Sequence, residues 1–125
     1  IQLHGSETKK RVNEIKNMGL KVIKALKIRD SQDINRFREF DNADIILFDT
    51  PSMEKTMEFP KNLITKVPIG TKYALAGSIS EDNVENISKL GVNFFDLSSS
   101  LENQLGYKDH HKIKSFIKKI NEIKN

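Results

Sequence analysis

The chain contains no cysteine among its 125 residues. This absence excludes disulfide bonds and thiolate metal sites and agrees with a reducing compartment, so we expect a cytoplasmic protein. No apolar run approaches the roughly 18 residues that a membrane span requires, and no targeting segment can be recognised. A membrane is therefore not an expected partner.

Concentrated positive charge is also lacking. The 21 Lys and Arg residues outnumber the 17 Asp and Glu residues and give a net charge of +4, but they are scattered along the chain. Because no basic stripe with interleaved aromatic residues is present, nucleic acid is not an expected partner. With 37% hydrophobic and 30% charged residues, the composition is typical of a soluble globular protein, and residues 1–125 fit one domain.

Glycine and proline are few, with 6 and 3 residues. No G-x-G-x-x-G sequence follows a predicted strand, which removes the best support for a dinucleotide-binding fold. The chain opens with Ile1 instead of Met, in the middle of an expected strand. We therefore expect a fragment or a processed piece of a longer protein.

Strand and helix patterns alternate along the chain. Strands are predicted at residues 1–4, 20–28, 44–49, 71–76 and 92–97. The first helix is predicted at residues 9–18 with Ser6 as N-cap, and the second from Asp30 or Ser31 to about Phe40. A loop at 51–56 precedes a short helix at 59–66, and another helix runs from Ser80 to Gly91. The last helix follows an Asp109 cap, and its apolar stripe is Ile113, Phe116, Ile117 and Ile120. Such a run of βα units without a hairpin predicts a parallel sheet covered by helices, either an open doubly wound sheet or a (β/α)8 barrel.

The segment Ile45–Asp49 is the clearest strand, and Thr50-Pro51 stops it. A carboxylate at the C-terminal end of a parallel strand lies where α/β enzymes place their chemistry, so Asp49 is a candidate general acid. An acid at neutral pH needs a pKa that burial has raised. The alternative is that Asp49 is only a cap or turn residue.

Other polar residues also lie at or near strand ends, namely Gln2, His4, Lys24 and Asp96. Period-2 alternation puts Gln2 and His4 on a shared face, and in a barrel such residues converge at the C-terminal mouth. Each has a structural alternative. His4 can be a hydrogen-bonded structural histidine, Lys24 can pair with a carboxylate inside the barrel, and Asp96 can brace backbone amides instead of touching substrate.

Small residues follow the last two predicted strands, as Gly77-Ser78 and Ser98-Ser99-Ser100. Small side chains let backbone N–H groups approach an anion, and barrels commonly bind phosphate in the loops after their last two strands. This pairing favours a phosphate site over ordinary serine-rich turns.

Several short motifs occur in a characteristic order. They are Gln2-Leu3-His4-Gly5-Ser6-Glu7, Val22-Ile23-Lys24-Ala25, Ile46-Leu47-Phe48-Asp49-Thr50, Leu75-Ala76-Gly77, Asn83-Val84, Asp96-Leu97-Ser98-Ser99, Leu101-Glu102 and Gly106-Tyr107-Lys108-Asp109. Together they resemble the phosphoribosylanthranilate isomerase family of tryptophan biosynthesis, from that family's fourth strand to its last helix. The resemblance implies a TIM (β/α)8 barrel fold, represented here by an incomplete barrel of five βα units, strands four to eight.

The resemblance also implies roles. The family catalyses an Amadori rearrangement of an N-phosphoribosyl aminoaldose to the aminoketose, on a small phosphorylated substrate and without metal or cofactor. Asp49 would protonate the ribose ring oxygen. Gly77, Ser78, Ser99 and Ser100 would bind phosphate through backbone amides, and Gln2, His4 and Asp96 would line the anthranilate and ribose side.

The chain departs from the family pattern at three places. The family's general base is a cysteine on its first strand. This chain contains no cysteine, so we expect these 125 residues alone to be inactive. Residues 53–59 replace a glycine-rich segment, and Ser78 and Ser100 replace glycines.

Two other functions stay open. The protein can be another phosphosugar isomerase or epimerase barrel, or a non-catalytic, flavodoxin-like α/β domain that binds a phosphorylated ligand or a partner protein.

Overall fold

The computed structural model describes residues 1–50, 65–68, 70–77, 79–92 and 94–124. The predicted loop at 51–56 and most of the predicted helix at 59–66 lie outside the described residues. None of the described helices combines the length and apolar character that a membrane span requires.

Five parallel strands form one sheet in chain order, from β1 to β5. They are β1 Gln2–Leu3, β2 Ile23–Lys27, β3 Ile45–Asp49, β4 Tyr73–Ala76 and β5 Phe94–Asp96. The predicted order of parallel strands is confirmed, although each strand is shorter than its predicted range. Among the described residues the sheet stays open, with β1 and β5 as its outer strands.

The helices between the strands are α1 Lys9–Asn17, α2 Ser31–Asn35, α4 Val84–Ser88 and α5 His110–Lys124. The expected Ser6 cap of α1 is wrong, since Thr8 is the N-cap and its Oγ1 accepts from the N–H of Arg11 at 3.3 Å. Asp30 caps α2 as predicted, but from Arg36 to Phe40 the chain tightens into a 3-10 turn, η1. Asp109 also caps α5 as predicted, accepting from the N–H groups of His111 and Lys112.

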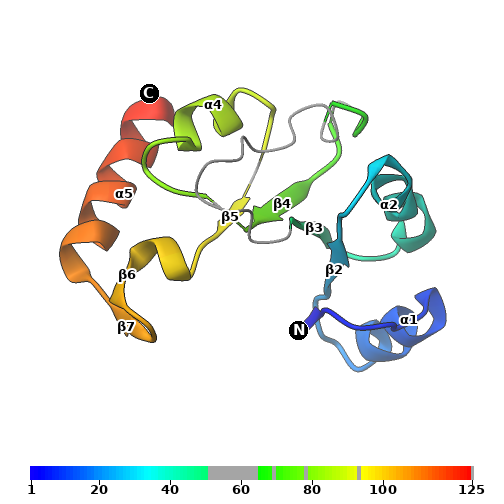
Figure 1. The fold of residues 1–125 in the computed structure, drawn as a ribbon. Coiled ribbons are helices and arrows are strands. Elements are labelled where there is room, and N and C mark those ends of the chain that lie inside the picture. Colours follow the sequence, from blue (N-terminus) through cyan, green and yellow to red (C-terminus); the bar gives the residue numbers. More distant parts are fainter. Residues whose placement is uncertain (51–64, 69, 78, 93, 125) are drawn as a thin grey trace.

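One face of the sheet holds most of the core. The large apolar cluster contains Leu26, Phe48 and Leu75 from the strands together with Val12, Ile34 and Ile87 from the helices. The opposite face carries only the small cluster Ala25, Leu47 and Ala74. Because helices cover one face and lie around the outside of the strands (Figure 1), the arrangement is that of a barrel wall and not of a doubly wound sheet, whose helices cover both faces.

The last helix shows a limit of the sequence pattern. Phe116 is buried, but Ile117, which was expected in the same apolar stripe, is 54% exposed. The stripe is therefore narrower than predicted and points only one side of α5 at the sheet.

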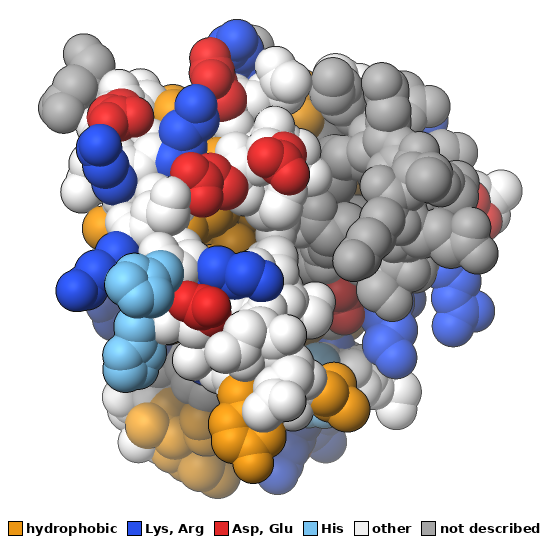
Figure 2. Space-filling view, turned by 60° about the vertical axis from the view of Figure 1, so that its left-hand side comes forward, with side chains coloured by type: hydrophobic (Ala, Val, Ile, Leu, Met, Phe, Trp, Pro, Cys, Tyr) orange, Lys and Arg blue, Asp and Glu red, His pale blue; other side chains and the backbone are white. Residues whose placement is uncertain are grey.

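An antiparallel hairpin follows β5, contrary to the expectation of no hairpin. A short 3-10 turn, η2 Ser99–Leu101, leads into β6 Glu102–Gln104, which pairs with β7 Tyr107–Lys108. Gly106 makes the turn with φ +83°, a conformation that L side chains rarely adopt. At the lower side, where Figure 1 places this hairpin, hydrophobic side chains gather on the surface in Figure 2, and Leu105 at its turn is 94% exposed.

Candidate active site

Asp49 ends β3 on the face of the sheet that the helices do not cover. Within the strand, Ile46 and Phe48 belong to the helix-side core, whereas Leu47 belongs to the small opposite cluster, and alternation puts Asp49 with Leu47. The register pairs Asp49 with Lys27 of β2 and with Ala76 of β4, and pairs Ala76 in turn with Asp96. These four residues form one row at the C-terminal ends of the strands.

A cavity of about 250 Å³ opens beside this row. Its lining includes six of the residues that the sequence singles out: Gln2, Asp49, Gly77, Asp96, Ser99 and Ser100. They come from β1, β3, β5 and the loops after β4 and β5, so segments far apart in sequence meet at one place. Ser78, which was expected to join them, lies outside the described residues.

The loop after β4 approaches the loop after β3 very closely. The N–H and the Oγ1 of Thr50 both donate to the carbonyl of Ala76, at 3.2 and 3.0 Å. Gly77 follows with φ +87°. The contact brings the backbone of residue 77 to the edge of the cavity, next to the strand that carries Asp49.

Lys108 of β7 holds the serine loop after β5. Its Nζ donates to the carbonyl and to the Oγ of Ser98, at 3.2 and 3.1 Å, and pairs with Glu102. The Lys108 hydrogen bond lowers the pKa of the Glu102 carboxyl, whose Oε2 also accepts from the N–H of Gly106. The hairpin therefore braces the loop that lines the cavity. Sequence analysis found Glu102 and Lys108 as motif residues but gave them no role.

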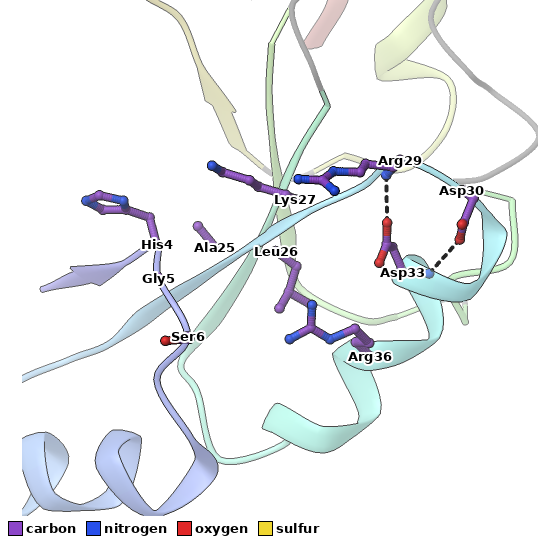
Figure 3. Close-up of a pocket in the computed structure, with 10 residues that line it drawn as sticks. All are labelled: His4, Gly5, Ser6, Ala25, Leu26, Lys27, Arg29, Asp30, Asp33 and Arg36. Atoms are coloured by element: carbon purple, nitrogen blue, oxygen red, sulfur yellow. Dashed lines mark hydrogen bonds between the residues drawn. The ribbon is translucent and has the colours of Figure 1, made fainter.

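His4 lies in a different cavity from Asp49. The strand β1 ends at Leu3, so the alternation that puts Gln2 and His4 on a shared face does not extend to residue 4. A separate cavity of about 470 Å³ is lined by His4 together with Lys27, Arg29 and Arg36 (Figure 3). Gln2 alone of this pair lines the cavity with Asp49.

Lys24 pairs with a carboxylate, as one alternative predicted, but not inside the barrel. Its Nζ lies 2.8 Å from the Oε2 of Glu7 and donates to the carbonyl of Gly5 at 2.9 Å. It also lies 5.2 Å from the centroid of the Phe40 ring, within the helix layer. Its place inside the barrel is thus wrong, because alternation in β2 turns Lys24 to the same side as Leu26.

Comparison with known proteins identifies the family. The family model described as N-(5'phosphoribosyl)anthranilate (PRA) isomerase matches residues 1–119. An N-(5'-phosphoribosyl)anthranilate isomerase from Petrotoga mobilis is 39% identical over 99% of this chain, which spans 61% of that protein.

Solved structures agree. The phosphoribosyl anthranilate isomerase from Thermotoga maritima is 30% identical, with a TM-score of 0.85 over 97% of this chain and 60% of that one. Another phosphoribosyl anthranilate isomerase, in complex with reduced 1-(o-carboxyphenylamino)-1-deoxyribulose 5-phosphate, is 28% identical, with a TM-score of 0.75 over 97% of this chain and 58% of that one. The chain thus spans about three fifths of the relatives that it matches, and over that length it belongs to the N-(5'-phosphoribosyl)anthranilate isomerase family.

Proposed function

We propose that the complete protein catalyses the phosphoribosylanthranilate isomerase reaction of tryptophan biosynthesis, the Amadori rearrangement of N-(5-phosphoribosyl)anthranilate to carboxyphenylamino-deoxyribulose phosphate. The observation that carries this proposal is the position of Asp49 in one cavity with Gly77, Ser99 and Ser100, in a chain of this family. A relative binds a reduced form of the product. The substrate is a small phosphorylated molecule, and we place the reaction in the cytoplasm.

Asp49 acts as the general acid. Protonation of the ribose ring oxygen breaks its bond to C1′ and opens the ring to a protonated Schiff base between C1′ and the aromatic amine. Loss of the C2′ proton then gives an enolamine, which tautomerises to the aminoketose. Asp49 is half-buried at the cavity wall, so it can reach a substrate in the cavity while the protein shields it partly from solvent.

The C2′ proton requires a second group as general base. The resemblance assigns that role to a cysteine, and this chain contains none. We therefore propose that the base is not among these 125 residues and that they supply the acid and the phosphate loops.

The phosphate group binds at Gly77, Ser99 and Ser100, which line the cavity and whose small side chains let backbone N–H groups approach an anion. Ser78 would belong to this set but lies outside the described residues. Gln2 and Asp96 line the same cavity and contact the ribose and aromatic side. His4 belongs to the neighbouring cavity, so its contact with substrate requires the ligand to extend toward β2.

Complementation tests this function. In a bacterial strain that lacks the isomerase, the complete reading frame containing this sequence is expected to restore growth without tryptophan. Asp49→Asn removes the proton donor, so turnover of the purified complete protein should fall by on the order of 10²–10⁴-fold, with an unchanged circular dichroism spectrum. Asp82→Asn, an exposed carboxylate on the loop before α4, serves as matched control and should keep full turnover.

Other outcomes select the alternatives. Turnover of a different phosphosugar, with none of phosphoribosylanthranilate, would assign the protein to another isomerase or epimerase reaction. Phosphate-ligand binding without any turnover would leave a non-catalytic binding domain. Full activity in Asp49→Asn would remove Asp49 from the acid role.

A further inference from the structure

A cavity with no assigned ligand lies at the ends of β1 and β2, beside the candidate active site. It measures about 470 Å³, and three cationic side chains line it, those of Lys27, Arg29 and Arg36, together with His4. In Figure 3, Lys27 and Arg29 extend side by side toward His4, and Arg36 reaches toward β2 from the helix side. Residues from three different segments therefore line one cavity.

The two carboxylates that line the cavity offset part of this positive charge but form no ion pair with the three cationic side chains. Asp30 caps α2 and accepts from the N–H of Gln32. It also accepts from the N–H of Asp33, and the Oδ2 of Asp33 accepts from the N–H of Arg29 at 2.9 Å (dashed lines in Figure 3). Among the described residues, no carboxylate lies within 4.0 Å of a side-chain nitrogen of Lys27, Arg29 or Arg36. Within the part of the chain that the structure describes, these cationic groups therefore face solvent and are available to a ligand.

We propose that this cavity is an oxyanion-binding site, separate from the serine-loop site beside Asp49. Guanidinium and ammonium groups that line one cavity favour carboxylate or phosphate, because charge-assisted hydrogen bonds are the strongest that such donors form. The size of the cavity admits a group larger than a single ion. Its ligand is either an oxyanion group of a larger molecule or a free inorganic anion.

The register shows how the site connects with the chemistry. Lys27 is the direct neighbour of Asp49 in the β2–β3 ladder and shares its face of the sheet. A ligand whose phosphate lies at Ser99 and Ser100 and whose reacting atoms lie at Asp49 would therefore extend toward Lys27. The oxyanion site itself does not depend on the proposed function. The oxyanion has two possible sources, a free anion and the carboxylate at the end of the proposed substrate opposite its phosphate. Only the second source rests on the proposed function.

Binding of inorganic phosphate to the purified protein tests the site without any turnover. Backbone amide resonances are expected to shift in two independent sets, one around residues 77 and 98–100 and one around residues 4, 27, 29 and 36. The double variant Lys27→Met with Arg29→Met should weaken binding at the second set by roughly tenfold or more and leave the first unchanged. The double variant Lys114→Met with Lys118→Met, which removes two exposed lysines of α5, is the charge-matched control and should alter neither set.

A second arm identifies the source of the oxyanion. Reduced 1-(o-carboxyphenylamino)-1-deoxyribulose 5-phosphate carries both a phosphate and a carboxylate. If the substrate carboxylate occupies the site, this compound displaces phosphate from both sets and binds roughly tenfold more weakly to the double variant. If a free anion is the ligand, the compound displaces phosphate from the serine-loop set alone and binds the variant normally.

Either source supports the site. A single set of shifts around the serine loop, or a second set that the double variant does not weaken, would overturn it. Loss of activity in Asp49→Asn and binding at Lys27 are separate measurements, so failure of the proposed function is distinguishable from failure of the oxyanion site.

Discussion

The backbone oxygen of Thr50 would lie only 2.1 Å from a Cβ atom placed on Gly77. Real Cβ atoms do not approach backbone that closely, so any side chain at residue 77 would push the exits of β3 and β4 apart. Those two exits carry Asp49 and a wall of its cavity. The smallest residue at this position thus sets the distance between the candidate acid and the candidate phosphate loop.

The variant Gly77→Ala tests this relationship. It adds a steric clash with Thr50 to the cost of φ +87°, so we expect a loss of at least about 2 kcal/mol in the free energy of unfolding, measured by urea denaturation. Gly91→Ala is the matched control, because Gly91 has φ +80° but no atom within 4 Å of the position that a Cβ would occupy. It should cost only about 1–2 kcal/mol, and an equal loss in both variants would contradict the role of the contact.

The pair of Lys24 and Glu7 has unequal partners. The Lys24 side chain is 1% exposed and that of Glu7 is 27% exposed. Glu7→Ala leaves a buried ammonium group with the Gly5 carbonyl and the face of the Phe40 ring but without a counter-charge, so we expect a loss of about 3 kcal/mol. Lys24→Met leaves a carboxylate that water can reach and should cost about 1–2 kcal/mol.

Both variants are compared by urea unfolding at neutral pH. Glu14→Ala breaks the exposed pair of Glu14 with Arg11 and should change the free energy of unfolding far less than Glu7→Ala does, because solvent screens this pair. A larger loss of unfolding free energy in Lys24→Met than in Glu7→Ala would show that burial of the remaining charged group does not decide which variant is less stable.

Acid should remove the contribution of Glu7. The hydrogen bond from Lys24 lowers the pKa of Glu7 below 4.5 in the folded protein. The unfolded chain therefore binds this proton at a higher pH, so the stabilisation is present above that value and is lost as the pH falls through the folded-state pKa. We expect the difference in stability between the wild type and Glu7→Gln to be largest at neutral pH and to shrink below about pH 4. A difference that does not change with pH would exclude this linkage.

The brace formed by Lys108 should affect binding more than stability. The Lys108 side chain is 43% exposed, so Lys108→Met is expected to change the free energy of unfolding by less than about 1 kcal/mol. Because it frees the carbonyl and hydroxyl of Ser98, inorganic phosphate should bind the serine loop several-fold more weakly, on the order of one lost hydrogen bond. Titration calorimetry measures this change.

Two variants complete that test. Lys108→Arg keeps a cation within reach of Glu102 and should restore part of the affinity. Lys118→Met removes the lysine of an exposed pair on α5 and should leave phosphate binding unchanged. Equal weakening in Lys118→Met would assign the effect to net charge and not to the brace.

Local patterns predicted much of the architecture. The apolar run Ile45–Asp49 and the caps Asp30 and Asp109 are encoded in contiguous residues, and the structure confirms them. The N-cap of α1 was predicted wrongly, because Ser6 and Thr8 both precede the helix and both carry a hydroxyl group that can cap it. The hairpin of β6 and β7 was missed because strands of three and two residues carry no measurable alternation.

The sequence by itself determined the order of parallel strands, the carboxylate at the end of β3 and the small residues after β4, since each depends on periodicity and on residue type within a few positions. Only the tertiary structure decided which of these residues share a cavity. Strand register places Lys27 beside Asp49, the end of β1 separates His4 from Gln2, and the hairpin brings Lys108 to Ser98. Such neighbours are set by the pairing of distant backbone segments, which no stretch of contiguous residues specifies.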